Sequence, residues 1–144
     1  MDKLKRRTAR ENAFFAAFAS TFDNAMPDEV IEIHNEVGEN TVDTFGQKLI
    51  ESYYEHSAEV NDIIRDHLKG WTIDRIPRVS LTILRLALSE ILYGEEKLPG
   101  VTINEAVELA KKFGGDDDYQ FVNGLLGSVV RELGLTDENS VVQE

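Results

Sequence analysis

Apolar side chains recur at intervals of three and four residues along most of the chain, which is the spacing of one face of an α-helix. In the first segment this pattern runs through several alanines and phenylalanines and predicts a helix from about residue 4 to 22. Pro27 suits the first position of a second helix, over about 27–37, because its fixed φ is already helical. The N-terminal quarter is therefore expected to be two helices joined by a short turn.

Two more helices are expected in the middle of the chain. Thr41 is placed to cap a helix of about 42–56, and Ser57 to cap another of about 58–68, because a hydroxyl at this position accepts a hydrogen bond from a free backbone N–H. Gly70 then closes the fourth helix. Both segments keep their apolar residues on one face, so both are expected to pack against a common core.

The next two helices have clear boundaries in the sequence. A strongly apolar helix opens at Pro77 or Ser80 and ends at Gly94. Thr102 and Glu105 have the spacing of a capping box, which predicts a helix from Thr102 to Phe113. Gly114 is expected to stop that helix in the left-handed conformation.

The last helix is expected to start at three consecutive carboxylates, because negative charge opposes the positive end of the helix dipole. The pair Asn123-Gly124 is typical of a β-hairpin, but the helical spacing continues through it and no strand pattern survives. The predicted fold is all-α, with about seven helices in a single domain over residues 1–134. Residues 135–144 are expected to form a flexible tail.

Composition fits a globular domain and narrows the chemistry. The chain has 144 residues, 42% of them hydrophobic and 29% charged, with no cysteine. The lack of cysteine excludes disulfides, zinc–thiolate sites and a thiol nucleophile, and it suits the reducing cytoplasm, where we expect the protein to act. No apolar run approaches the roughly 20 residues that a membrane-spanning helix needs.

Charge is distributed unevenly. The net charge is −12, yet the first ten residues carry +4 and the other 134 carry −16. A positive end on a negative body can attract a polyanion at one place only. Arginine also matches phosphate well, because its planar fork donates two hydrogen bonds at once. The candidate RNA-binding cations are Lys3, Lys5, Arg6, Arg7 and Arg10, against the ordinary alternative of a solvated helix start.

Aromatic residues follow the basic cluster. Four phenylalanines fall within nine residues, at positions 14, 15, 18 and 22, more than one buried stripe needs. Core packing explains most of them. One exposed ring could stack on an unpaired base, and Phe18 is the candidate for that ring. Trp71 is expected to be a large buried core residue at the connection after the fourth helix.

Catalytic and metal-binding patterns are missing from the sequence. Asp116, Asp117 and Asp118 are better explained by helix capping than by a cation site, and the three histidines have no ligand spacing. Arg85 and Glu90 on the apolar helix are expected to belong to a half-buried ion pair. We expect no metal, no cofactor and no enzymatic activity.

Three stretches together resemble the NusB family. They are RRTARENAFFAAF, ILRLALSEILY and, most specifically, VTINEAVELAKKFGGDDDYQFVNGLL. The resemblance implies two packed three-helix bundles, over about 1–68 and 71–134. It also implies a role in bacterial transcription antitermination, in which boxA RNA of ribosomal RNA transcripts is bound together with the ribosomal protein NusE. Contact with other Nus factors and RNA polymerase would be indirect.

The resemblance also implies specific site residues. Phe18 occupies the position of a family tyrosine, so the ring is kept and its hydroxyl is lost. Phe121 is implied to lie on the RNA side of the family surface, and Asp117 near the NusE side. Alternative interpretations are a helical protein–protein scaffold without RNA affinity of its own, or an RNA-binding partner of an RNA methyltransferase. Pairing of two copies of the chain stays open.

Overall fold

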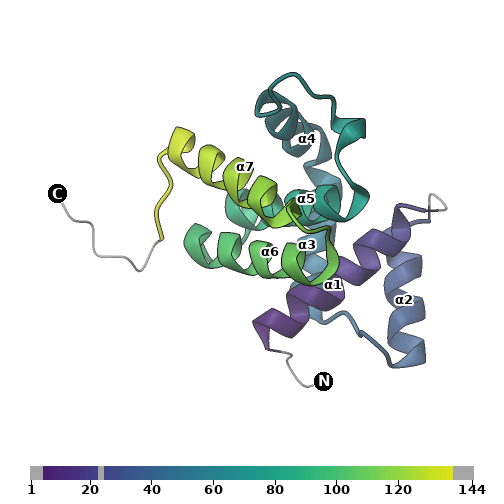
Figure 1. The fold of residues 1–144 in the computed structure, drawn as a ribbon. Coiled ribbons are helices and arrows are strands. Elements are labelled where there is room, and N and C mark those ends of the chain that lie inside the picture. Colours follow the sequence, from purple (N-terminus) through teal and green to yellow (C-terminus); the bar gives the residue numbers. More distant parts are fainter. Residues whose placement is uncertain (1–4, 23–24, 138–144) are drawn as a thin grey trace.

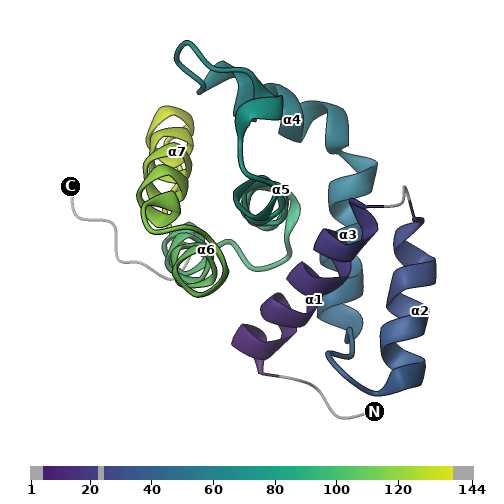
Figure 2. The same ribbon diagram turned by 45° about the vertical axis from the view of Figure 1, so that its right-hand side comes forward.

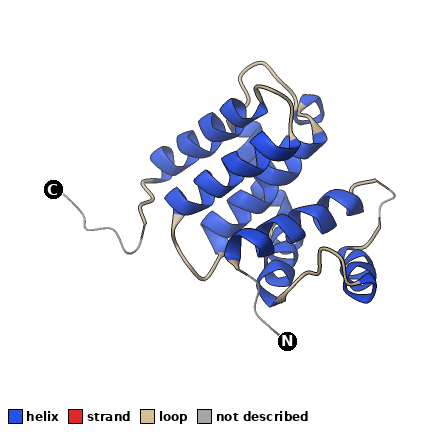
Figure 3. Cartoon of the chain, turned by 60° about the horizontal axis from the view of Figure 1, so that its bottom comes forward, coloured by secondary structure: helices blue, strands red, loops and turns tan. Residues whose placement is uncertain are grey.

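The computed structural model describes residues 5–22 and 25–137. Within these residues the chain forms seven α-helices and one short 3₁₀ turn, and no strand (Figures 1 and 3). The prediction of an all-α fold with about seven helices is confirmed. The elements are α1 (Arg6–Ser20), α2 (Pro27–Val37), α3 (Thr44–Glu55), α4 (Ser57–Asp66), the 3₁₀ turn η1 (Ile73–Arg75), α5 (Arg78–Tyr93), α6 (Pro99–Phe113) and α7 (Asp118–Leu133).

Helix α5 lies at the centre of the molecule. It contacts α6 and α7 on one side and α1, α3 and α4 on the other, and Figure 2 looks almost along its axis. Helices α5, α6 and α7 pack on one another, as do α1, α2 and α3. Since α1 and α3 both reach α5, the two groups of three helices share a continuous interface.

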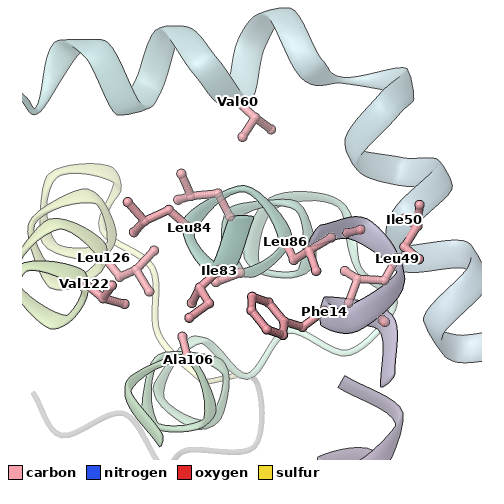
Figure 4. Close-up of a cluster of buried hydrophobic side chains, with 14 of the residues drawn as sticks. Phe14, Leu49, Ile50, Val60, Ile83, Leu84, Leu86, Ala106, Val122 and Leu126 are labelled. Atoms are coloured by element: carbon pink, nitrogen blue, oxygen red, sulfur yellow. The ribbon is translucent and has the colours of Figure 1, made fainter. Parts of the chain in front are cut away.

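The core follows from the apolar faces that the sequence pattern marks. Phe14 of α1, Val60 of α4, Leu84 of α5 and Val122 of α7 are all almost completely buried, and they belong to one continuous cluster. Figure 4 shows these side chains converging around α5. Burial of large apolar side chains contributes about 1.5–3 kcal/mol each, so this cluster is the main source of stability.

Two helix boundaries agree closely with the sequence. Pro27 is the first residue of α2, and Gly38 ends this helix in the left-handed region, with φ of 83°. Helix α7 runs without a break through Asn123-Gly124, so the decision against a hairpin is confirmed.

Other predicted caps are wrong. The cap of α3 is Asp43 rather than Thr41, because the Asp43 carboxylate accepts a hydrogen bond of 2.8 Å from the Gly46 N–H. Ser57 is the first residue of α4 rather than its cap. The N-cap position of α4 is His56, whose side chain makes no capping hydrogen bond. The helix bounds shift by only one or two residues.

Gly114 ends α6 by a different means from the one predicted. Its backbone is extended, with φ of −93°, and not left-handed. A Cβ at this position would lie 2.7 Å from the Ala110 carbonyl oxygen. Glycine is therefore required for close approach of the chain to the end of α6.

The chain continues along the surface after α7. Leu135 packs against the core, and the Asp137 carboxylate accepts a hydrogen bond of 2.8 Å from the Gly100 N–H. The rest of the predicted tail, residues 138–144, lies outside the described residues. None of the helices described is long and apolar enough to cross a membrane.

Candidate nucleic-acid interface

The basic cluster lies at the start of α1. Lys5 immediately precedes the helix and is exposed, Arg6 is half-buried and Arg7 is exposed. Lys3, the remaining lysine of the predicted cluster, lies outside the described residues. No acidic residue stands in the first turn of α1, so positive charge meets the positive end of the helix dipole, which is locally unfavourable.

Arg10 is the most buried of these cations. Its guanidinium donates two hydrogen bonds to the Glu90 carboxylate of α5, at 2.9 and 2.7 Å. The two side chains are 13% and 8% exposed, so the pair lies inside the seam between α1 and α5. Burial lowers the pKa of Arg10, but the hydrogen bonds and charge of Glu90 outweigh it and leave the pKa above its ordinary value.

Glu90 has a second donor, which overturns the predicted capping box. The Thr102 hydroxyl donates to the Glu90 carboxylate at 2.8 Å instead of capping α6, which begins three residues earlier at Pro99. The expected ion pair of Glu90 exists, but its partner is Arg10. Arg85 instead donates to the Asn61 side-chain oxygen at 3.0 Å.

Arg7 makes a similar pair at the surface. Its guanidinium donates to both oxygens of Glu105 on α6, at 3.0 and 2.8 Å. The hydrogen bond from Arg7 lowers the pKa of Glu105 despite the partial burial of its carboxyl, and hydrogen bonding to Glu105 in turn raises the pKa of Arg7. Glu105 therefore stays ionised at neutral pH, and it pairs with α1 rather than capping its own helix.

Arg6 makes the weakest of the three pairs. Its Nε lies 3.2 Å from a Glu96 oxygen, and its guanidinium lies over the Phe45 ring at 4.2 Å from the ring centre. All three arginines of the predicted cluster thus contact carboxylates beyond residue 89. Glu96 and Glu105 are not identifiable as their partners from the sequence, since nothing local links residues about 90 positions apart.

Four rings extend from the core toward the end of α1. Phe14 is buried, and Phe18 stacks on it at 5.6 Å between ring centres. Phe18 is half-buried, so its prediction as the exposed ring is wrong. The exposed ring is Phe22, which is 52% exposed and meets Phe18 edge-on. The reason is that Phe22 lies just beyond the last turn of α1, where the core ends. The Arg78 guanidinium lies 4.3 Å from the centre of the Phe22 ring.

The described residues contain no group of three or more His, Cys, Asp or Glu side chains that could hold a metal ion. The acidic run before α7 has a local role instead. The Asp118 carboxylate accepts a hydrogen bond of 2.8 Å from the Gly115 N–H and so closes the turn between α6 and α7.

Comparison with known proteins places the chain in a family. The model of the NusB family matches residues 7–131. The chain belongs to the NusB family. It is 41% identical to the transcription antitermination protein NusB of Bacillus velezensis over 130 residues, which span 90% of this chain and 98% of that protein.

Solved NusB structures have the same fold. The T. maritima NusB structure superimposes with a TM-score of 0.80 at 30% identity, covering 91% of this chain and 94% of that one. A crystal structure of the antitermination factors NusB and NusE in complex with dsRNA superimposes with a TM-score of 0.78 at 29% identity, covering 88% of this chain and 96% of the other. The NusB fold expected from the sequence is therefore confirmed.

Two positions inferred from the NusB resemblance lie at the start of α7. Asp117 is exposed at the N-cap position, and Phe121 is half-buried one turn later. Phe121 stacks on Trp71, with the ring centres 5.5 Å apart and the planes 5° from parallel. Trp71 is 51% exposed, so the prediction that it is a buried core residue is wrong. The Trp71–Phe121 stack is thus an aromatic platform at the surface of this NusB fold. The exposure of its outer ring, Trp71, was not predicted, because tryptophan is highly buried on average.

Proposed function

We propose that this chain is an RNA-binding adaptor of bacterial transcription antitermination that binds boxA-type single-stranded RNA together with NusE. The main support is the solved complex of NusB and NusE with dsRNA, to which 88% of this chain is similar at 29% identity. Single-stranded boxA RNA as the ligand rests on the sequence resemblance. Other Nus factors and RNA polymerase would then be reached through this complex. We also propose that the chain acts in the cytoplasm and without catalysis of its own.

The geometry supports two kinds of RNA contact. Lys5, Arg6 and Arg7 present cationic groups at one end of α1, where phosphates can bind. Phe22 and Trp71 present exposed rings, on which unpaired bases can stack. Phe18 packs against Phe22, and Phe121 packs against Trp71, so each exposed ring has an aromatic neighbour that holds it in place. Lys3 stays a candidate on sequence grounds alone.

Arg10 has a different place in this proposal. Two of its N–H donors already bind the Glu90 carboxylate inside the α1–α5 seam, and its side chain is only 13% exposed. A phosphate would have to compete with this buried carboxylate for the guanidinium, which is unfavourable. Arg10 therefore serves the interface by fixing α1 against α5.

The test is fluorescence anisotropy of a labelled boxA RNA with the full chain, with and without NusE, at several salt concentrations. A scrambled RNA of equal length is the sequence control. The expected result is tighter binding of boxA than of the scrambled RNA, with further tightening by NusE. Equal, weak binding of both RNAs in every arm would instead favour a helical scaffold without its own RNA affinity.

A substitution separates the aromatic contact from general surface effects. Trp71→Ala removes the outer ring of the Trp71–Phe121 platform and should weaken boxA binding at least roughly fivefold, because base stacking on an aromatic side chain contributes about 1–3 kcal/mol. Leu133→Ala is the matched control, since Leu133 is 50% exposed against 51% for Trp71 and lies at the other end of α7. Equal binding by both variants would remove Trp71 from the interface.

A further inference from the structure

A groove between α1 and α6 contains both signs of charge. Its lining includes Arg7 and Glu11 from α1 and Glu105, Lys111 and Lys112 from α6. Cations in this groove contact carboxylates: Arg7 binds Glu105 at 2.8 Å, and Lys112 binds Glu11 at 3.1 Å. The groove therefore has the cations that a phosphate needs, but their charge is already compensated.

The Arg7–Glu105 pair is the most complete of these contacts. Both Glu105 oxygens accept hydrogen bonds from Arg7. The Glu105 side chain is only 12% exposed, whereas that of Arg7 is 68% exposed, so the negative charge lies beneath the guanidinium and solvent reaches mainly the cation. An arginine side chain has five N–H donors, and two of them are used by Glu105. The remaining donors can meet a phosphate, but the phosphate meets a pair whose net charge is zero.

Stability does not explain this pair well. Ion pairs with an exposed partner contribute about 0–1 kcal/mol to folding, and the buried Arg10–Glu90 pair already fixes α1 one turn further along. The main physical effect of Glu105 is to cancel one positive charge at the place where the sequence concentrates them.

We infer that Glu105 sets the RNA affinity of this protein by neutralising Arg7, so that the start of α1 binds RNA less tightly than its cations alone would allow. This inference rests on the proposed RNA-binding function. Glu96 has the same effect on Arg6 to a smaller degree, because that contact is longer, at 3.2 Å, and Glu96 is 59% exposed. A lowered intrinsic affinity makes stable RNA binding depend on additional contacts, such as those that NusE supplies.

The test is Glu105→Gln, which keeps the shape of the side chain and one acceptor for Arg7 while removing the negative charge. Binding of boxA RNA without NusE should tighten by roughly two- to fivefold at about 50 mM salt, the size of an exposed charge interaction. The plot of log affinity against log salt should become steeper by about 0.7, which corresponds to one more effective phosphate contact on a single strand.

Glu36→Gln is the matched control. It makes the same charge change on exposed α2, which lies on the other side of α1 from α6 (Figure 2). Its affinity and salt slope should equal those of the wild type. Thermal unfolding of both variants checks that the fold is intact.

The outcomes distinguish the inference from the function on which it rests. If the wild type binds boxA and Glu105→Gln binds equally or more weakly, the inference is wrong while the proposed function stands. The inference is also wrong if Glu36→Gln gains as much affinity, because the effect is then one of net charge. If neither the wild type nor Glu105→Gln binds boxA at about 20 mM salt, with or without NusE, the proposed function fails and the inference fails with it.

Discussion

Two arginine–glutamate salt bridges join α1 to α5 and α6, and they are chemically alike but differ in burial. Arg10–Glu90 lies inside the seam, with side chains 13% and 8% exposed, whereas Arg7 is 68% exposed above Glu105. Each is a bidentate contact between an arginine and a glutamate. The two arginines lie three residues apart along α1. Burial therefore decides what such a contact does: the inner pair holds the helices together, and the outer pair regulates the charge that the surface presents.

The largest expected effect comes from breaking the inner pair. Arg10→Ala leaves the Glu90 carboxylate buried without its cation, which should lower the free energy of unfolding by about 3–5 kcal/mol. Urea denaturation followed by far-UV circular dichroism measures this change. Arg65→Ala, on the exposed α4 pair with Asp62, is the control and should change stability by less than about 1 kcal/mol. A small effect of Arg10→Ala would mean that water reaches Glu90.

A double substitution removes both charges of the inner pair and so tests whether the unpaired charge causes the instability. Arg10→Met with Glu90→Leu replaces the inner pair by apolar side chains, and it should recover at least about 2 kcal/mol of the loss caused by Arg10→Ala, because no buried charge is left unpaired. Thr102 loses its acceptor but can still donate to the Leu98 carbonyl at 3.3 Å. Urea denaturation again measures the free energy of unfolding of the double variant. A double variant as unstable as the single one would show that the pair is needed for more than mutual charge compensation.

The outer pair should behave differently. Arg7→Ala should lower the free energy of unfolding by less than about 1 kcal/mol, since Arg7 is 68% exposed and removing this solvated cover lets water reach the Glu105 carboxylate. In the same samples, RNA binding should weaken and its salt dependence should become less steep. A loss of stability as large as that of Arg10→Ala would contradict the division between inner and outer pairs.

The smallest expected effect is a pH dependence. The pKa of Glu105 is lower in the folded chain than its ordinary value because Arg7 bonds its ionised form. Its contribution to stability is therefore present above the unfolded pKa of about 4.3 and is lost as the pH falls through the folded-state value. The stability difference between wild type and Glu105→Gln, under about 1 kcal/mol at pH 7, should shrink and then disappear as the pH falls through the folded-state pKa of Glu105. A difference that grew on acidification would mean that Glu105 is not bonded in its ionised form.

The sequence predicted the helices well because a helix depends on local spacing. Pro27 marks the first residue of α2, and the apolar period correctly carried α7 through Asn123-Gly124. The resemblance to NusB added the arrangement of these helices, which spacing alone does not contain.

The details of the candidate site were predicted less well, since they depend on contacts between distant residues. Thr102 and Glu105 have a valid capping-box spacing, but the Thr102 hydroxyl donates to Glu90 of α5 and the Glu105 carboxylate accepts from Arg7 of α1. Phe18 was predicted to be exposed and is half-buried, whereas Trp71 was predicted to be buried and is exposed, because the sequence does not show where the core ends. The cations were identified, but not the glutamates that neutralise them.

The long separation between paired residues has a consequence for how the chain is made. Arg10 and Glu90 are 80 positions apart, and Arg7 and Glu105 are 98 apart. At ribosomal speeds of about 5–20 residues per second, roughly 4–20 seconds pass between synthesis of α1 and synthesis of its partners. During that time α1 has neither its ion-pair partners nor the apolar face of α5. Helix α1 leaves the ribosome before α5 and α6 and yet is among the last helices to gain all its contacts, so the arrival of α5 and α6 sets the earliest moment at which the fold can close.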